Sequence, residues 1–379
     1  MAILGQPVAA DAARSGHLGG VDSGTVNPLY VEQYGNEVEH QFLKDSIMRQ
    51  YYNVRSVRGT DTIGSRRIGN VTLQAVSRST RPTDNAPDFD NIQLKIDTIV
   101  LARSNVFLLE EFQESIDTRK EIGVEHGKEI GKFFDEAFVI QAVKAAQVTN
   151  VAPDGTESGG WAHAVAALHP YVNLTPGSDI TTSTAVLIKR SAPVNFKGGN
   201  VVVLDTDGDE LVPDDLVSAI HRMCQMIEEK DVTLDDGIIL VRPAQFYALL
   251  ESDKLINKDF STGNGDFAAG TVMKVNGIRI ATTNRFAPIG SAADAAGTHH
   301  LSNAGNANAY DRTLIDNKAV AVFISSKSLL AGETIPLTSK VYYSDVELQW
   351  FIDSYLSFGV TPNRVEGAGA VFQNAADNL

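Results

Sequence analysis

Alternating apolar and polar residues predict a long β-hairpin between Arg58 and Asp97. One residue in two is apolar over much of residues 71–76 and 92–97, a period typical of half-buried strands. Between these arms, residues 79–87 contain two prolines, an aspartate and an asparagine, which favour a turn. A two-stranded ribbon is marginally stable alone. We therefore expect the hairpin to pack on another surface, either in the same chain or in another copy of it.

The clearest helix is predicted over residues 118–147, where apolar residues recur at three- and four-residue steps. It opens with a capping box formed by Thr118 and Glu121. Three glycines spaced four residues apart share one face of this helix: Gly123, Gly127 and Gly131. Each costs about 1 kcal/mol relative to alanine. Either another backbone packs closely against this face, or the packing tolerates three weak points.

The remaining elements follow from the same patterns. We expect a flexible arm over residues 1–30, a short helix or docking segment over 31–55, extended chain over 99–109 and a loop-rich insertion over 148–212. Helices are predicted over 214–230 and 245–250, and strands over 238–241, 272–275, 278–282, 319–324 and 340–358. The dipeptide Asn276–Gly277 predicts a tight hairpin turn between two of these strands.

The composition is that of a soluble globular protein, with 43% hydrophobic and 21% charged residues in a chain of 379. This length predicts two or three lobes. No apolar run approaches 18 residues, and the first residues lack a basic leader followed by an apolar stretch, so neither a membrane span nor a secretory signal is expected. Cys224 is the single cysteine and lies among apolar residues at helical spacing. We expect it to be a small buried hydrophobe.

Charge separates the hairpin from the rest of the chain. The net charge of −15 argues against a dedicated nucleic-acid binder. Residues 56–95 hold six basic and four acidic side chains, a net charge of +2, so the remainder carries −17. A basic ribbon on an acidic body favours pairing between copies, and a solvated surface ribbon is the alternative. The residues we expect to make contacts between copies are Arg58, Arg66, Arg67, Arg78 and Arg81.

One acidic segment offers candidate metal ligands. Asp205, Asp207 and Asp209 occupy the first, third and fifth positions of a calcium-type loop. That loop requires glycine at position six and glutamate at position twelve, whereas this chain has Gly208 at position four and Leu216 at position twelve. A solvated acidic turn is the favoured interpretation.

Other candidate motifs for chemistry fail on spacing or context. Residues 263–268 imitate a dinucleotide-binding fingerprint but precede a predicted strand, where the fingerprint requires a helix. His126 and the pair His299–His300 lack the spacing of metal ligands, and we expect surface histidines. The sequence contains neither a nucleophile elbow nor a phosphate-binding P-loop. No catalytic residue, cofactor or metal site is therefore predicted.

The order of elements and several short segments resemble a known family. The order runs from arm to long hairpin, long helix, inserted α/β lobe and returning strands. The segments lie between residues 92 and 372: Ile96–Asp97, Gly127–Lys128, Asp135, the spacing Gly270, Val272, Val275 and Gly277, residues 319–330, the spacing Tyr355, Gly359 and Pro362, and residues 366–372. Together they resemble the major capsid protein of tailed bacteriophages, the Hong Kong 97 capsid fold, and in particular its short-tailed podovirus branch.

The resemblance implies an α+β fold with four parts. These would be an N-terminal arm (1–55), an extended β-hairpin loop (56–98), a peripheral domain with a long spine helix (99–150 and 336–379) and an axial domain (151–335). It also implies self-assembly through pentamers and hexamers into an icosahedral shell that encloses double-stranded DNA without sequence specificity. Scaffolding and portal proteins, together with a decoration protein, would be its further partners. It would be assembled in the host cytoplasm and located in the virion.

One departure from the family changes an expectation. Some members crosslink a lysine of the extended loop to an asparagine of a neighbour, but this chain has no lysine between Asp45 and Leu94. Arginine stays protonated and is a poor nucleophile, so no covalent crosslink is expected from this loop. Two alternatives stay open: an encapsulin-like cellular compartment, and an acidic α/β enzyme with a metal site near Asp205–Asp209.

Overall fold

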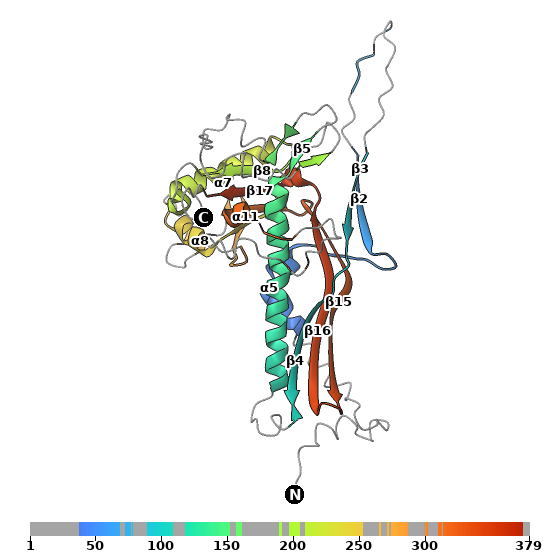
Figure 1. Ribbon diagram of the computed structural model, residues 1–379. Helices are drawn as coiled ribbons and strands as arrows, with labels where there is room; N and C mark the ends of the chain where they lie inside the picture. Colours follow the sequence, from blue (N-terminus) through green and yellow to red (C-terminus); the bar gives the residue numbers. More distant parts are fainter. Residues whose placement is uncertain are drawn as a thin grey trace. The chain divides into compact units, whose positions relative to one another are not determined.

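The computed structural model describes most of the chain (Figure 1). The described residues are 38–68, 73–76, 78, 89–108, 118–151, 157–160, 189–191, 197–204, 209–252, 265–266, 271–272, 274–286, 299, 301, 310–312 and 314–373. They form two compact units, drawn from residues 1–61, 95–137 and 331–359 for the first and from residues 62–94, 138–330 and 360–379 for the second.

The first unit is built on a four-stranded sheet in the order β1-β15-β16-β4. Its strands are β1 (Arg55–Ser56), β15 (Leu329–Ser344), β16 (Gln349–Pro362) and β4 (Val100–Phe107), of which β15 and β16 are joined by a turn at residues 345–348. β1 pairs in parallel with β15, and β16 pairs antiparallel with β4. Figure 1 shows the long helix α5 (Thr118–Gln147) running beside these strands. Their shared core contains Val106, Trp350 and Ile352.

The glycine face of α5 carries the segment that precedes β1. Residues 38–45 are helical and are followed by α3 (Ile47–Tyr51). A Cβ atom added at Gly127 would lie 2.7 Å from the carbonyl oxygen of Val38, so only glycine allows this approach. The prediction of a closely packed backbone is confirmed at Gly127, and so is the predicted short helix before β1.

The second unit is built on a six-stranded sheet in the order β12-β13-β9-β14-β17-β8. Its strands are β12 (Lys274–Val275), β13 (Ile278–Thr282), β9 (Gly237–Val241), β14 (Ala319–Ser325), β17 (Ala368–Phe372) and β8 (Asn200–Val203). Every residue of β9, β14, β17 and β8 is buried, as expected for strands covered on both faces. Helices α7 (Pro213–Glu228) and α8 (Pro243–Leu250) contribute to this core.

Several short elements complete the described chain. A three-stranded sheet contains β6 (Glu157–Ser158), β5 (Thr149–Val151) and β7 (Lys189–Ser191), and a two-stranded sheet contains β10 (Gly265–Asp266) and β11 (Thr271–Val272). Another two-stranded sheet, here called the ribbon, consists of β2 (Thr62–Ile68) and β3 (Phe89–Lys95). Single turns of helix are η2 (Asp209–Leu211), η3 (Val365–Gly367) and α11 (Leu314–Asn317).

Most predicted elements are confirmed where the chain is described. α5 has the predicted bounds, α7, α8, β9 and β14 lie within a few residues of theirs, and the predicted extended chain over 99–109 contains β4. Asn276 and Gly277 have φ angles of 52° and 80°, as the predicted hairpin turn requires. The predicted arm over residues 1–30 and the predicted turn over 79–87 lie outside the described residues.

One strand prediction differs from the structure. The strand predicted over residues 71–76 was wrong for 73–76, which are irregular, and the strand that pairs with β3 is β2. The inward positions of β2 are Ile63, Ser65 and Arg67. Two of the three are polar, so the sequence lacks the alternation of apolar and polar residues that predicts a strand. β17, which falls within residues 336–379 of the implied peripheral domain, lies in the six-stranded sheet between β14 and β8.

No helix within the described residues combines the length and apolar composition that crossing a membrane requires.

Candidate subunit interface

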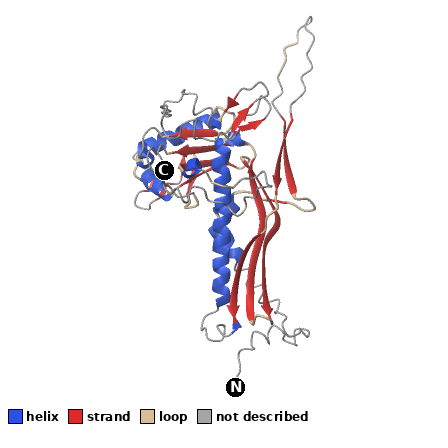
Figure 2. Cartoon of the chain, viewed as in Figure 1, coloured by secondary structure: helices blue, strands red, loops and turns tan. Residues whose placement is uncertain are grey.

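The ribbon has one buried and one exposed side near its β3 strand. Ile92 and Leu94 are buried, and so is Ile96 just beyond the strand, while the residues between them are exposed. Figure 2 shows β2 and β3 side by side as the described part of the ribbon. The apolar face predicted over residues 92–97 is therefore confirmed, and part of it is covered within the chain itself.

Large apolar side chains are exposed where β2 ends and β3 begins, and in the chain that follows β2. Leu73 is 97% exposed and Phe89 is 70% exposed, and Ile68 and Val76 are exposed as well. Single exposed apolar residues are ordinary on protein surfaces. Four of them lie within about twenty residues of the sequence, and burial of such side chains by a partner would be favourable.

The five arginines singled out by the sequence fall into three groups. Arg58, Arg66 and Arg78 are exposed. Arg81 lies outside the described residues. The side chain of Arg67 is only 3% exposed, and its Nη1 lies 3.4 Å from Oε2 of Glu366 in the same chain. Within the single chain Arg67 therefore pairs internally, and the contacts expected between copies for the five arginines stay a prediction.

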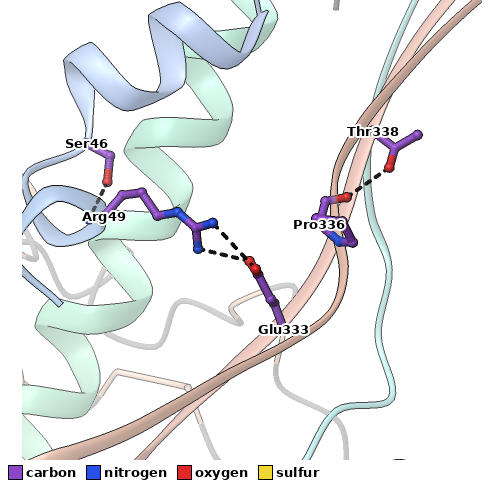
Figure 3. A network of polar contacts seen from close by, with 5 residues as sticks. All are labelled: Ser46, Arg49, Glu333, Pro336 and Thr338. Carbon is purple, nitrogen blue, oxygen red and sulfur yellow. Dashed lines mark hydrogen bonds and ion pairs between the residues drawn. The ribbon is translucent and has the colours of Figure 1, made fainter. Parts of the chain in front are cut away.

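The segment before the ribbon is fixed to the first unit by one carboxylate. Asp135 on α5 accepts hydrogen bonds from Ser46 Oγ at 2.7 Å, Ile47 N at 2.8 Å and Met48 N at 3.0 Å. Ser46 in turn caps α3 by accepting from the backbone N–H of Arg49 (Figure 3). The sequence indicated Asp135 only through the family resemblance, and the structure gives it this capping role.

An ion pair fixes the same segment to strand β15. Arg49 donates from Nη1 to Oε2 of Glu333 at 2.9 Å and from Nη2 to Oε1 at 3.5 Å (Figure 3). Arg55 and Ser56 then pair as β1 with Gly332 and Glu333. These contacts hold residues 49–56, shortly before the ribbon, within the first unit.

The face of the four-stranded sheet that bears Arg103 is partly exposed. Arg103 makes a bidentate pair with Asp353, with N–O distances of 2.7 and 2.8 Å. This hydrogen bonding raises the pKa of Arg103. Phe351 stacks on Tyr342 with ring centroids 5.3 Å apart. Leu101 and Phe107 of β4 are also exposed, and they lie on the same face of the strand as Arg103 because side chains alternate between faces. This face offers a second surface with exposed apolar and charged groups.

Two histidines predicted to lie at the surface are buried instead. His126 is 8% exposed, and its Nε2 lies 2.8 Å from Ser104 Oγ on β4. Burial lowers the pKa of His126, while the charge of Asp353 acts in the opposite direction. The sequence held a signal for this, because His126 is four residues from both Ile122 and Ile130 on one helix face. His299 is also buried and stacks on Tyr310, and His300 lies outside the described residues.

The candidate metal-ligand, cysteine and dinucleotide-binding segments of the sequence are described only in part. Within those residues no cluster of three or more His, Cys, Asp or Glu side chains is arranged to hold a metal ion. Asp205 and Asp207 lie outside them, and Asp209 begins η2. Cys224 is buried as predicted, and burial raises its pKa to about 11. Gly265, part of the imitated dinucleotide fingerprint, lies in strand β10.

Comparison of sequences with known proteins gives no relative. No family model matches the chain, and no curated protein matches its sequence.

Comparison with solved structures gives chains of similar fold. The asymmetric unit of the bacteriophage PhiM1 mature capsid is 23% identical, with 88% of each chain covered and a TM-score of 0.64. The capsid of cyanophage P-SCSP1u is 16% identical, with 86% of this chain and 88% of that chain covered and a TM-score of 0.66. A structure from Mycobacterium phage Che8 is 13% identical, with 86% and 90% covered and a TM-score of 0.52. The chain has the Hong Kong 97 capsid fold.

The predicted fold class is thereby confirmed. In this Hong Kong 97 fold the ribbon is the described part of the extended β-hairpin loop, and α5 is the spine helix.

Proposed function

We propose that this chain is a major capsid protein that self-assembles, through pentamers and hexamers, into the icosahedral shell of a tailed phage around double-stranded DNA. The observation that supports this most is a fold shared with two phage capsid chains over at least 86% of each chain. A shell of many identical subunits sums modest contacts over many copies, so no single interface needs to be strong.

The parts of the chain receive roles in this proposal. Residues 56–98 serve as the extended loop that lies over a neighbour, and residues 99–150 and 336–379 as the peripheral domain. Residues 151–335 form the axial domain at the centre of each pentamer or hexamer. Because β17 lies in the six-stranded sheet, we assign residues 368–372 to the axial domain as well.

The ribbon and the chain on either side of β2 contribute charged and apolar side chains to the contact with a neighbouring copy. Arg58, Arg66 and Arg78 are exposed, and Leu73 and Phe89 add apolar surface. We include Arg81 from its place in the sequence. An exposed ion pair contributes about 0–1 kcal/mol, so repetition over the shell supplies the strength. Without a lysine in this loop, the contact is noncovalent.

Further partners belong to the same proposal. Scaffolding and portal proteins assist assembly, a decoration protein binds the finished shell, and the DNA is held without sequence specificity. The chain has a structural role, with no catalytic activity, cofactor or metal. It assembles in the host cytoplasm and resides in the virion.

Electron microscopy of the purified protein tests the proposal. The full chain, concentrated and supplied with its scaffolding protein, is expected to form closed particles of uniform size. A chain that stays monomeric under these conditions while its circular dichroism shows a folded protein would contradict a shell function.

A further inference from the structure

The hairpin at one edge of the six-stranded sheet exposes two basic side chains at opposed positions. Lys274 of β12 pairs in register with Arg279 of β13, and both are exposed, whereas Val275 and Ile278 between them are buried. Residues 274–282, here called the basic hairpin, contain these two basic side chains and no acidic one. Like charges directly opposite each other destabilise a pair of strands. A carboxylate from outside the hairpin would therefore be stabilising here.

The chain that leads into α7 exposes acidic and apolar side chains together. Residues 209–215, here called the acidic segment, contain four acidic side chains and no basic one. Leu211 and Val212 are 54% and 42% exposed, and Asp214 and Asp215 are exposed just after them. Apolar side chains bordered by charged ones are typical of surfaces at which two proteins bind.

The two surfaces lie at opposite ends of α7. The acidic segment runs into the first turn of this helix at Pro213, whereas the side chain of Asn276, in the turn of the basic hairpin, reaches Cys224 near the other end. The helix between Pro213 and Cys224 is about 16 Å long.

The sheet topology gives the same separation. The strands β8, β17, β9 and β13 all run in one direction. The acidic segment follows the carboxyl end of β8, and the turn of the basic hairpin precedes the amino end of β13. The two surfaces of one chain therefore do not meet.

We propose that the basic hairpin of one copy binds the acidic segment of a second copy in a head-to-tail contact. The contact brings Asp214 and Asp215 to the pair of Lys274 and Arg279 and covers exposed apolar surface next to them. Complementary surfaces at different places on one molecule repeat from copy to copy, and they close into a ring where the rotation allows. The inference rests on the proposed shell function, because pentamers and hexamers are rings of this kind.

The charges of the two surfaces together favour a second copy as the occupant. A nucleic acid would suit the basic hairpin but would be repelled by the acidic segment, and a metal ion would suit only the acidic segment. A second copy supplies the opposite charge to both surfaces at once. It also repeats the contact with every further copy that joins.

Disulfide formation between two cysteine variants of the full chain tests the head-to-tail geometry. Lys274→Cys and Leu211→Cys place one thiol on each surface and leave Arg279 and the two aspartates of α7 in place. Cys224 is buried and its pKa is raised to about 11, so it does not compete. After assembly and mild oxidation with copper phenanthroline, an equal mixture of the two variants should give linked dimers, and neither variant alone should. Dimers from one variant alone, or none from the mixture, would overturn the proposal.

A chain that carries both cysteines shows whether the contact closes. It should give a ladder of linked copies on a denaturing gel that ends at five and six copies and collapses on reduction. Asp235→Cys, combined with Lys274→Cys, is the matched control, because Asp235 is exposed in the same unit and lies outside the acidic segment. A ladder that continues beyond six copies, or an equal ladder from the control, would contradict a closed head-to-tail ring.

Reversal of the charges tests what holds the contact together. Arg279→Glu and Asp214→Lys should each raise the protein concentration needed for half-maximal assembly about fivefold, as light scattering measures it. The two substitutions in one chain restore opposite charges across the contact and should return this concentration toward the parent value. A double variant that assembles no better than the single ones, while circular dichroism shows it to be folded, would overturn the pairing of charges.

Electron microscopy of the same samples separates this contact from the shell function. Closed particles that form without a disulfide in the mixture would overturn the contact and leave the shell function in place. A parent chain that is folded and stays monomeric would overturn both.

Discussion

The spine helix and the ribbon both have apolar residues along one face, and they differ in how much of that face is buried within the chain. α5 is covered within its own chain: Gly127 admits the backbone of residues 38–45, and buried Asp135 is satisfied by three hydrogen bonds. The ribbon is covered only near β3, and Leu73 remains almost wholly exposed. The helix is thus stabilised by contacts within the chain, whereas apolar side chains at the end of the ribbon and beyond it remain exposed.

The largest expected effect is on the helix side of this comparison. Asp135→Asn replaces an accepting oxygen with an amide that donates toward backbone N–H groups, and buried donors lose their acceptor. We expect a loss of about 3 kcal/mol in the free energy of unfolding, measured by urea denaturation. Glu129→Gln is the matched control, because Glu129 is an exposed carboxylate on the same helix, paired with Lys132. Equal effects of the two substitutions would show that Asp135 does not secure the segment.

The glycine face gives a second test with an internal control. At Gly127 an added Cβ would lie 2.7 Å from Val38 O and 2.9 Å from Gln41 Cβ, whereas at Gly131 its nearest neighbours are 3.7 Å away. Gly127→Ala should cost about 2 kcal/mol by overpacking. Gly131→Ala should stabilise by about 0.5–1 kcal/mol through helix propensity. Thermal unfolding of both variants measures this, and the same sign for both would contradict the packing described here.

The contrast also explains which parts of the fold could be predicted from the sequence. α5 was predictable because its apolar residues repeat at the helical period and its glycines repeat every four residues. The sequence pattern did not predict β2, because two of its inward positions are the polar residues Ser65 and Arg67. Arg67 is buried against Glu366, which is about 300 residues away in the sequence. No local pattern reveals such a pairing. The sequence pattern likewise did not indicate which of the ribbon arginines is buried.

Protonation of His126 should weaken the packing of α5 on β4 in acid. Its pKa is lowered in the folded chain, so folding favours the neutral ring. Its contribution is fully present above the ordinary value of 6.5 and is lost as pH falls below that value toward the lowered one. The decline cannot exceed about 1.4 kcal/mol per pH unit for one group. Urea denaturation at several pH values measures this slope.

Substitution of the histidine shows whether the slope belongs to it. His126→Gln keeps a polar group near Ser104 but cannot titrate, so the decline between pH 6.5 and 5 should become shallower. His40→Gln is the control, because His40 is an exposed histidine of the same unit. A slope unchanged in His126→Gln would assign the acid sensitivity to other groups.

The smallest expected effect on the single chain is on the exposed side of the ribbon, where Arg66 and Arg67 are neighbours with opposite surroundings. Arg66→Glu alters an exposed side chain and should change the free energy of unfolding by less than about 0.5 kcal/mol. It should nevertheless raise the protein concentration needed for assembly, because each contact loses up to about 1 kcal/mol and repels instead.

Arg67→Glu places a second carboxylate beside Glu366 and should destabilise the single chain before assembly is tested. Light scattering for assembly and urea denaturation for folding, applied to both variants, separate the two roles. Shells that form from Arg66→Glu at the parent concentration would remove Arg66 from the contact surface. An unfolding curve unchanged in Arg67→Glu would show that the pair of Arg67 and Glu366 does not stabilise the chain.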